Sequence, residues 1–187
     1  MKKLTLFILL ISVSISSFSQ ETAIETEQKK HEVKINSISL IGFSWLDISY
    51  EYLINNESSF GIAGLISFNN DESLDTYKTY SITPYYRRYF SKKYAQGFFI
   101  EGFGMLNGYK ENKYLYYDYI GLPLSQHPRK TATNFALGVT AGAKFVSPNG
   151  FVVEFYFGIG RNLFRNFDYG LNDRIVGRGG VSLGYRF

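Results

Sequence analysis

Charged residues recur on the polar side of segments in which apolar and polar residues alternate. The six that fall near one end of their segments are Glu51, Arg87, Glu101, Lys144, Glu154 and Arg186. In chain order their signs alternate, beginning with a negative charge. Because a buried charge without a partner is costly, charges that share one interior must pair with one another. The sequence therefore predicts a structural ion-pair network in which Arg87 faces Glu101, and Lys144 faces Glu154, across neighbouring strands joined by short turns. The alternative is a narrow gated path for protons or ions.

Residues suited to metal binding or nucleophilic chemistry are scarce. The chain has two histidines, His31 and His127, far apart in the sequence, and no cysteine. Zinc sites need clustered ligands and disulfides need cysteine, so neither kind of site is expected. The glycines Gly158 and Gly160 are not a phosphate-binding loop, because no helical pattern follows them. We therefore expect no metal and no cofactor.

Eight segments carry the period-two alternation that predicts β-strands. In chain order they are Glu32–Phe43, Leu46–Ile54, Ser59–Phe68, Tyr77–Phe90, Gly97–Asn107, Thr133–Val146, Phe151–Phe164 and Ile175–Phe187. Ser37 and Ser39 interrupt the apolar side of the first segment, and a very tight turn is expected near Gly42–Ser44. Pro84 cannot donate a hydrogen bond to a neighbouring strand, so we expect a bulge or local break there. The direction of Phe103 in the fifth segment is left open.

The last segment separates its two faces clearly. Its apolar face holds Val181, Leu183, Tyr185 and Phe187, and its other face holds Arg178, Gly180, Ser182, Gly184 and Arg186. Membrane-spanning barrel strands have this form, with apolar residues toward lipid and polar residues inside. The sequence therefore predicts an all-β fold, an eight-stranded antiparallel up-and-down transmembrane β-barrel. Alternation alone does not say which face lies inside, so a soluble secreted barrel that binds a small apolar ligand is a further alternative.

Residues 1–20 predict export. Lys2 and Lys3 precede an apolar run, Leu4–Val13, and Ser17-Phe18-Ser19 provides a cleavage site with small residues around Phe18. This is the form of a secretory signal peptide, and its apolar run is too short to span a bilayer as a helix. We expect a signal peptide over residues 1–19, a flexible periplasmic lead-in over residues 20–31 and an outer-membrane β-barrel domain over residues 32–187.

The expected mature chain is nearly neutral. Removal of Lys2 and Lys3 lowers the count of Lys and Arg from 20 to 18, against 16 Asp and Glu, so the net charge is 18 − 16 = +2. So small an excess gives no case for nucleic-acid binding. No later segment approaches the ~20 consecutive apolar residues of a membrane helix. An exported chain of this kind can cross a membrane only as a closed barrel.

Several stretches together carry a resemblance to known barrels. They read ISYEYLI, YSITPYYRRYF, GFFIEGFG, FALGVTAGAKFV, GFVVEFYFGIGRN and GGVSLGYRF. The chain resembles small eight-stranded barrels of the OmpA/OmpX type and is similar to a domain-of-unknown-function family of small outer-membrane barrels. The resemblance implies a monomer in the lipid of a Gram-negative outer membrane, with no particular ligand. Tyr185 and Phe187 match the final aromatic pair that the barrel assembly machinery recognises, while Ser182 stands where that signal usually has glycine.

Some barrels that this chain resembles act on lipid A, acyl chains or peptides through histidines at the rim. Here His127-Pro128-Arg129 lacks the His-x-Ser spacing of the lipid A deacylase type. We therefore expect no enzyme, and a lipid-modifying barrel hydrolase is the alternative. The function expected is that of a structural or surface-interaction barrel with a plugged, charged lumen.

The longest expected connection, Gly108–Ala132, is rich in tyrosine and ends in basic residues. The residues concerned are Tyr109, Tyr114, Tyr116, Tyr117, Tyr119, Arg129 and Lys130. They fit an extension of the neighbouring strands, with tyrosines at the membrane interface. They also fit an adhesive or glycan-binding surface whose basic residues contact an acidic sugar. The extracellular ligand of such a surface is unknown.

Overall fold

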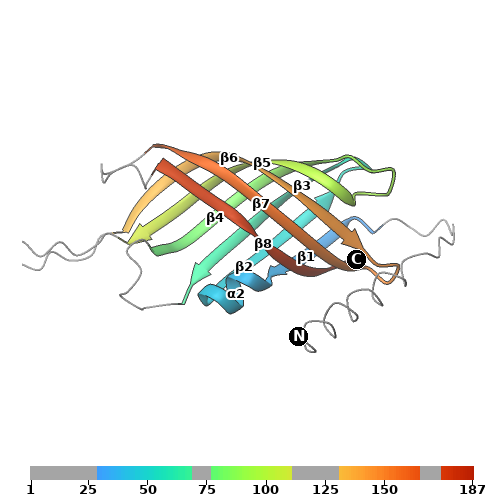
Figure 1. Cartoon of the computed structure of the whole chain (residues 1–187), viewed down its shortest axis with the longest axis horizontal. Coiled ribbons are helices and arrows are strands. Elements are labelled where there is room, and N and C mark those ends of the chain that lie inside the picture. Colours follow the sequence, from blue (N-terminus) through green and yellow to red (C-terminus); the bar gives the residue numbers. More distant parts are fainter. Residues whose placement is uncertain (1–28, 69–76, 111–130, 165–173) are drawn as a thin grey trace, which may run out of the picture.

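A closed antiparallel barrel forms the body of the protein. The computed structural model describes residues 29–68, 77–110, 131–164 and 174–187. The elements are β1 (His31–Asn36), α2 (Ser37–Phe43), β2 (Trp45–Leu53), β3 (Ser58–Ser67), β4 (Tyr77–Tyr89), β5 (Gly97–Lys110), β6 (Thr131–Val146), β7 (Phe151–Phe164) and β8 (Ile175–Arg186). Each strand pairs with the next in the chain, and β8 pairs with β1 to close the barrel (Figure 1). The predicted all-β, eight-stranded up-and-down fold is confirmed.

Most strand boundaries lie close to those predicted, and β7 has the predicted bounds. The fifth and sixth strands are longer than expected. Their pairing continues through Tyr109 opposite Ala132 and Lys110 opposite Thr131. The connection predicted over Gly108–Ala132 is therefore shortened at both ends. Its central part, residues 111–130, lies outside the described residues.

The first predicted strand is wrong over its second half, where the chain forms the helix α2. The side chain of Asn36 caps this helix by accepting a hydrogen bond from the Ser39 amide (3.3 Å), and Ser44 ends it in the left-handed conformation (φ 55°). Asparagine and serine compete in this way with strand pairing, because their side chains satisfy backbone groups locally. The predicted tight turn at Gly42–Ser44 is thus the end of a helix.

The helix α2 continues the barrel wall where β1 stops. Strand β1 pairs with β8 only from Ser182 to Arg186, whereas β7 pairs with β8 from Ile175 onward. Helix α2 contacts β8 and β2 beside this shorter seam (Figure 1). The Ser37 hydroxyl donates to the carbonyl oxygen of Val181 (2.8 Å), which ties the helix to β8.

Of the bulge or local break expected at Pro84, the structure has the local break and no bulge. The register shift between β4 and β5 lies instead between Lys78 and Tyr80. Around the proline, the pairs pass from Ile82 opposite Leu106 to Tyr85 opposite Phe103 without a shift. Only the local pairing toward β5 lapses, as expected for a residue without an N–H group.

The two faces of the wall differ sharply in burial. Apolar side chains such as Phe60, Ile82 and Phe157 point outward and are 51%, 50% and 76% exposed. Small, polar and charged side chains point into the lumen, together with several aromatic rings that include the buried Phe103. This is the reverse of the arrangement that a soluble ligand-binding barrel requires. Among the described residues, no helix is long and apolar enough to cross a membrane.

Glycines let the lumen pack tightly against the wall. A Cβ added at Gly138 would lie 2.3 Å from the Phe103 ring and 2.6 Å from the carbonyl oxygen of Ile159. A Cβ added at Gly158 would lie 2.3 Å from the Thr140 hydroxyl. Contacts this short exclude side chains at both positions. The inward ring of Phe103 therefore occupies the space that the missing side chain leaves.

Candidate functional site

Nine charged residues meet inside the barrel and form what we call the lumen charge cluster. Its members are Glu32, Lys34, Glu51, Arg87, Glu101, Lys144, Glu154, Arg178 and Arg186. At most 9% of any of these side chains is exposed. The cluster draws on β1, β2, β4, β5, β6, β7 and β8, so it links nearly the whole circumference.

The carboxylate of Glu51 lies at the centre of the cluster. It accepts hydrogen bonds from Lys34, from Arg87 Nη1 (2.9 Å) and from Lys144 Nζ (2.7 Å). The hydroxyl groups of Ser59 and Tyr89 donate to its other lone pairs. With the more distant Tyr85 hydroxyl (3.4 Å), three cations and three hydroxyls surround one carboxylate that has no access to water.

The guanidinium of Arg87 joins three carboxylates. Its Nη1 and Nη2 atoms donate to both oxygens of Glu154 (2.6 and 2.7 Å), and its Nε donates to Glu101 (2.6 Å). The same group lies over the rings of Phe99 (4.3 Å) and Tyr85 (4.6 Å). A planar guanidinium suits such a site because it offers a fixed fork of donors and flat faces for aromatic rings.

Arg186 closes the end of the cluster near the short turns. Its guanidinium pairs with Glu32 (2.6 Å) and donates to the carbonyl oxygens of Tyr94 (3.1 Å) and Ala95 (2.8 Å). Tyr94 and Ala95 belong to the turn between β4 and β5, so this turn folds across the end of the lumen. Burial raises the pKa of the Tyr94 phenol in this turn.

The other end of the lumen is polar but carries fewer charges. The amide of Asn36 donates to Asp47 (3.1 Å) and to the Tyr156 hydroxyl (3.0 Å). Lys78 contacts the sulfur of Met105 (3.2 Å). Between the two ends, Arg178 pairs with Glu101. Polar contacts therefore run from the turn at Tyr94 to the opposite rim.

Opposite charges nearly balance in the cluster. Five basic and four acidic members give a formal charge of 5 − 4 = +1. Buried networks of this kind stabilise a unique structure when every member has partners, and destabilise it when one is missing. An eight-stranded barrel is just wide enough for side chains to fill, so the cluster occupies the lumen as packing.

All six of the charges predicted from the sequence lie in the cluster, but one predicted pair does not form. Arg87 and Glu101 face each other as expected. Lys144 and Glu154 are directly opposite in register, yet Lys144 contacts Glu32 (2.8 Å) and Glu51 instead. The reason is that a lysine side chain is long enough to cross this narrow lumen and reach the opposite wall.

Three members of the cluster were missed by the sequence analysis. Glu32 and Lys34 alternate with Val33 and Ile35 on β1, so the sequence did contain the pattern of a strand with one charged face. Extending the predicted strand to Phe43 obscured it. Arg178 was placed on the inward face, but its greater distance from the strand end left it outside the predicted set.

The aromatic residues at the end of β8 lie on the outer surface. Tyr185 is 48% exposed and Phe187 is 52% exposed. The Phe187 ring stacks on His31 at 5.9 Å, and the backbone groups of these two residues form two hydrogen bonds (3.0 and 2.8 Å). Lys29 lies over the Tyr185 ring at 5.3 Å.

The tyrosine-rich surface predicted from the sequence is only partly within the described residues. Tyr109 is half-buried on β5. The remaining predicted residues, Tyr114, Tyr116, Tyr117, Tyr119, Arg129 and Lys130, lie outside the described part, as does His127.

His31 Nδ1 contacts the Tyr50 hydroxyl at 2.6 Å. Within the described ranges, no group of three or more His, Cys, Asp or Glu side chains is placed to hold a metal ion.

Fold and site together define a small closed β-barrel with a charged, filled lumen. The chain belongs to the family described as "Protein of unknown function (DUF3575)", whose model matches residues 5–178. The predicted resemblance to a family of unknown function is confirmed in this form. No curated protein and no solved structure matches the chain.

We predict that removing one charge from the cluster is far more costly than removing one from the surface. Glu154→Gln removes one carboxylate partner from both Arg87 and Lys34, which leaves buried positive charge in excess, and should lower the free energy of unfolding by roughly 3–5 kcal/mol. The matched control is Glu57→Gln in the exposed Arg88–Glu57 pair (2.8 Å), which should cost at most about 1 kcal/mol. Urea unfolding in detergent micelles measures both, and equal losses would contradict the network.

The same measurement tests which partners interact directly. Combining Arg87→Gln with Glu154→Gln should give a coupling of roughly 0.5–3 kcal/mol, because the two side chains share two hydrogen bonds. Combining Lys144→Gln with Glu154→Gln should give a smaller coupling, since these residues are opposite in register without direct contact. A larger coupling for the Lys144–Glu154 pair than for the Arg87–Glu154 pair would contradict the contacts described for the cluster.

Proposed function

We propose that the protein is a small outer-membrane β-barrel that acts through its outer surface and has a plugged lumen. The observation that carries this proposal is the distribution of polarity across the wall. Fully buried charges such as Glu51 and Lys144 lie inside, whereas large apolar side chains such as Phe157 lie outside. A protein surrounded by water has the opposite preference, since charges are rarely buried and large apolar surfaces are covered.

The length of the apolar outer band supports membrane residence. On β7, outward apolar residues follow one another at every second position from Phe151 to Ile159. This run covers nine residues, and a tilted strand needs about 9–11 residues to cross the hydrocarbon. Strand β1 pairs with β8 from Ser182 to Arg186, and beyond this seam the side chains of Asn36 and Ser37 donate to the carbonyl oxygens of Gly179 and Val181. A lipid environment demands that such backbone groups have partners within the protein. The signal peptide expected over residues 1–19 also supports export of the chain.

The filled lumen supports a structural or surface-interaction role over conduction. Ion pairs occupy the lumen from β1 to β8, and the turn at Tyr94 and Ala95 folds across one end. An ion crossing this layer would have to replace direct contacts of 2.6–2.9 Å between fixed charges. We therefore propose a non-conducting barrel without catalysis, similar in kind to the OmpA/OmpX-type barrels that the sequence resembles. In planar bilayers we expect no steady conductance.

Fractionation tests the proposed location directly. The expressed full chain should be recovered in the outer-membrane fraction, and its band should migrate differently in detergent gels before and after boiling. A folded barrel resists detergent until it is heated, because its closed hydrogen-bond network has no edge at which to open. Recovery in the soluble periplasm, with identical mobility in both lanes, would contradict the proposal.

The end of β8 is proposed as the assembly signal. Tyr185→Ser together with Phe187→Ser should reduce the amount of folded barrel in the outer membrane several-fold. The matched control is Phe151→Ser together with Phe155→Ser on β7, because these outward aromatic residues are each 49% exposed, against 48% and 52% for Tyr185 and Phe187. If both double variants lose the same amount, the effect is a general loss of apolar surface and β8 has no special role.

A further inference from the structure

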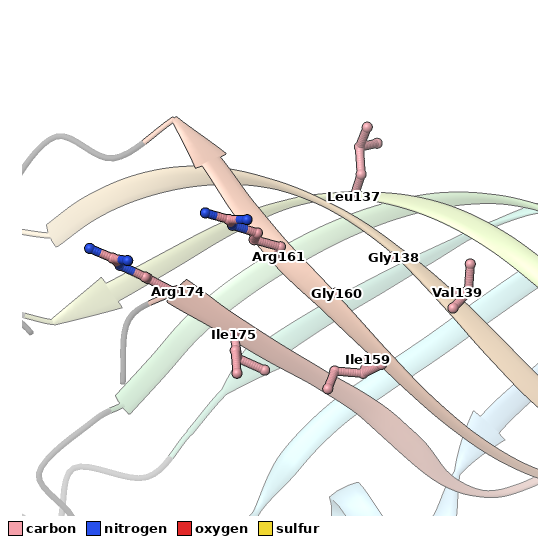
Figure 2. A pocket seen from close by; sticks show the side chains of 8 residues that line it. All are labelled: Leu137, Gly138, Val139, Ile159, Gly160, Arg161, Arg174 and Ile175. Atoms are coloured by element: carbon pink, nitrogen blue, oxygen red, sulfur yellow. The ribbon is translucent and has the colours of Figure 1, made fainter. Parts of the chain in front are cut away.

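An apolar groove runs along the outer face of the barrel over β6, β7 and β8. It has a volume of about 640 Å³ and is lined by Leu137, Gly138, Val139, Ile159, Gly160, Arg161, Arg174 and Ile175. Figure 2 shows these residues on three neighbouring strands. The four aliphatic side chains that line it are between 50% and 60% exposed. None of the described residues that line it is acidic.

A glycine on β8 lies beside the groove. Beyond Ile175, the next outward position of β8 is Gly177, which lies opposite Ile159. A Cβ added at Gly177 would meet no atom within 4 Å. Gly177 is not itself a lining residue, but a larger side chain there would project into the open space beside Ile159.

Two arginines mark one end of the groove. Arg161 is paired with Ile175 across β7 and β8, and Arg174 directly precedes Ile175. Figure 2 shows both side chains directed toward the end of the barrel where β7 ends and β8 begins. Within the described residues neither guanidinium has an ion-pair partner. Two guanidinium groups on one side of an apolar groove fit a phosphate group, which arginine binds through paired hydrogen bonds.

The position of Arg161 along β7 matches the membrane surface, an argument that rests on the proposed function. The outward apolar run ends at Ile159, and Arg161 is the next outward position. An outward charge is unfavourable at the bilayer centre but nearly free of cost at the interface. The three short turns lie at the opposite end of the barrel, so the arginines face the outer leaflet if short turns are periplasmic.

We propose that this groove binds a phosphorylated glycolipid of the outer leaflet, of the lipid A type. Its acyl chain lies against Leu137, Val139 and Ile159, and its phosphate accepts hydrogen bonds from Arg161 and Arg174. A phosphate monoester carries a charge of about −1.5 to −2 at neutral pH. Two arginines complement that charge better than they complement the single charge of a phosphodiester lipid.

The test compares lipids retained by the purified, full-length barrel in native mass spectrometry. Detergent-solubilised protein is incubated with diphosphorylated lipid A, with dephosphorylated lipid A or with phosphatidylglycerol. Wild type should retain diphosphorylated lipid A about tenfold or more above the other two lipids. Arg161→Gln together with Arg174→Gln should abolish this preference. Arg88→Gln, which removes an exposed arginine beside Glu57, should keep it.

A second variant tests the groove independently of its charges. Gly177→Leu places a side chain in the open space and should lower retention of diphosphorylated lipid A while both arginines remain. Equal retention of the three lipids by wild type would overturn the proposal. So would unchanged retention in the double arginine variant.

The outcome also separates this inference from the proposed function. If wild type inserts into lipid as a heat-modifiable barrel but shows no preference for diphosphorylated lipid A, only the proposed glycolipid binding in the groove is overturned. A chain that stays in the aqueous phase without inserting overturns both.

Discussion

A carboxylate that is fully buried in a narrow barrel requires cations on several sides, and Glu51 is that carboxylate. Its cationic partners come from β1, β4 and β6, which do not pair with one another. Shifting a strand by one residue would turn its inward side chains to the outer face. A shift of one residue in β1, β4 or β6 would therefore remove Lys34, Arg87 or Lys144 from Glu51. The requirement to neutralise a buried charge thus disfavours such shifts in three strands at once.

The same alternation that directs charges inward directs apolar side chains outward. On β4, Arg87 points into the cluster while Tyr86 next to it is 51% exposed. On β7, Glu154 points inward while Phe155 is 49% exposed. A lumen filled with ion pairs has no room for these apolar groups, so their stabilisation must come from outside the barrel. This links the cluster to the proposed lipid environment, and to the groove on the same outer face.

Strand number, strand order and the direction of most side chains could be predicted from the sequence, because each depends on local period-two alternation. Features that depend on distance across the lumen could not. Register places Lys144 beside Glu154, but only the structure shows that Lys144 reaches Glu32 and Glu51. Helix α2 was missed because Asn36 caps it through a local side-chain contact that also fits a strand or turn. The outer groove combines residues of three strands, so it could not be predicted from the pattern of any single segment.

The most direct test asks whether the outer wall of the barrel faces lipid or water. The chain has no cysteine, so single spin labels can be attached through Phe155→Cys, Phe157→Cys and Asn149→Cys. Phe155 and Phe157 are outward on β7, and Asn149 is exposed in the turn before it. In reconstituted bilayers, labels at the two β7 positions should be more accessible to oxygen than to a water-soluble nickel chelate, with the reverse at Asn149. Equal access of the nickel chelate to all three positions would contradict a lipid-facing wall.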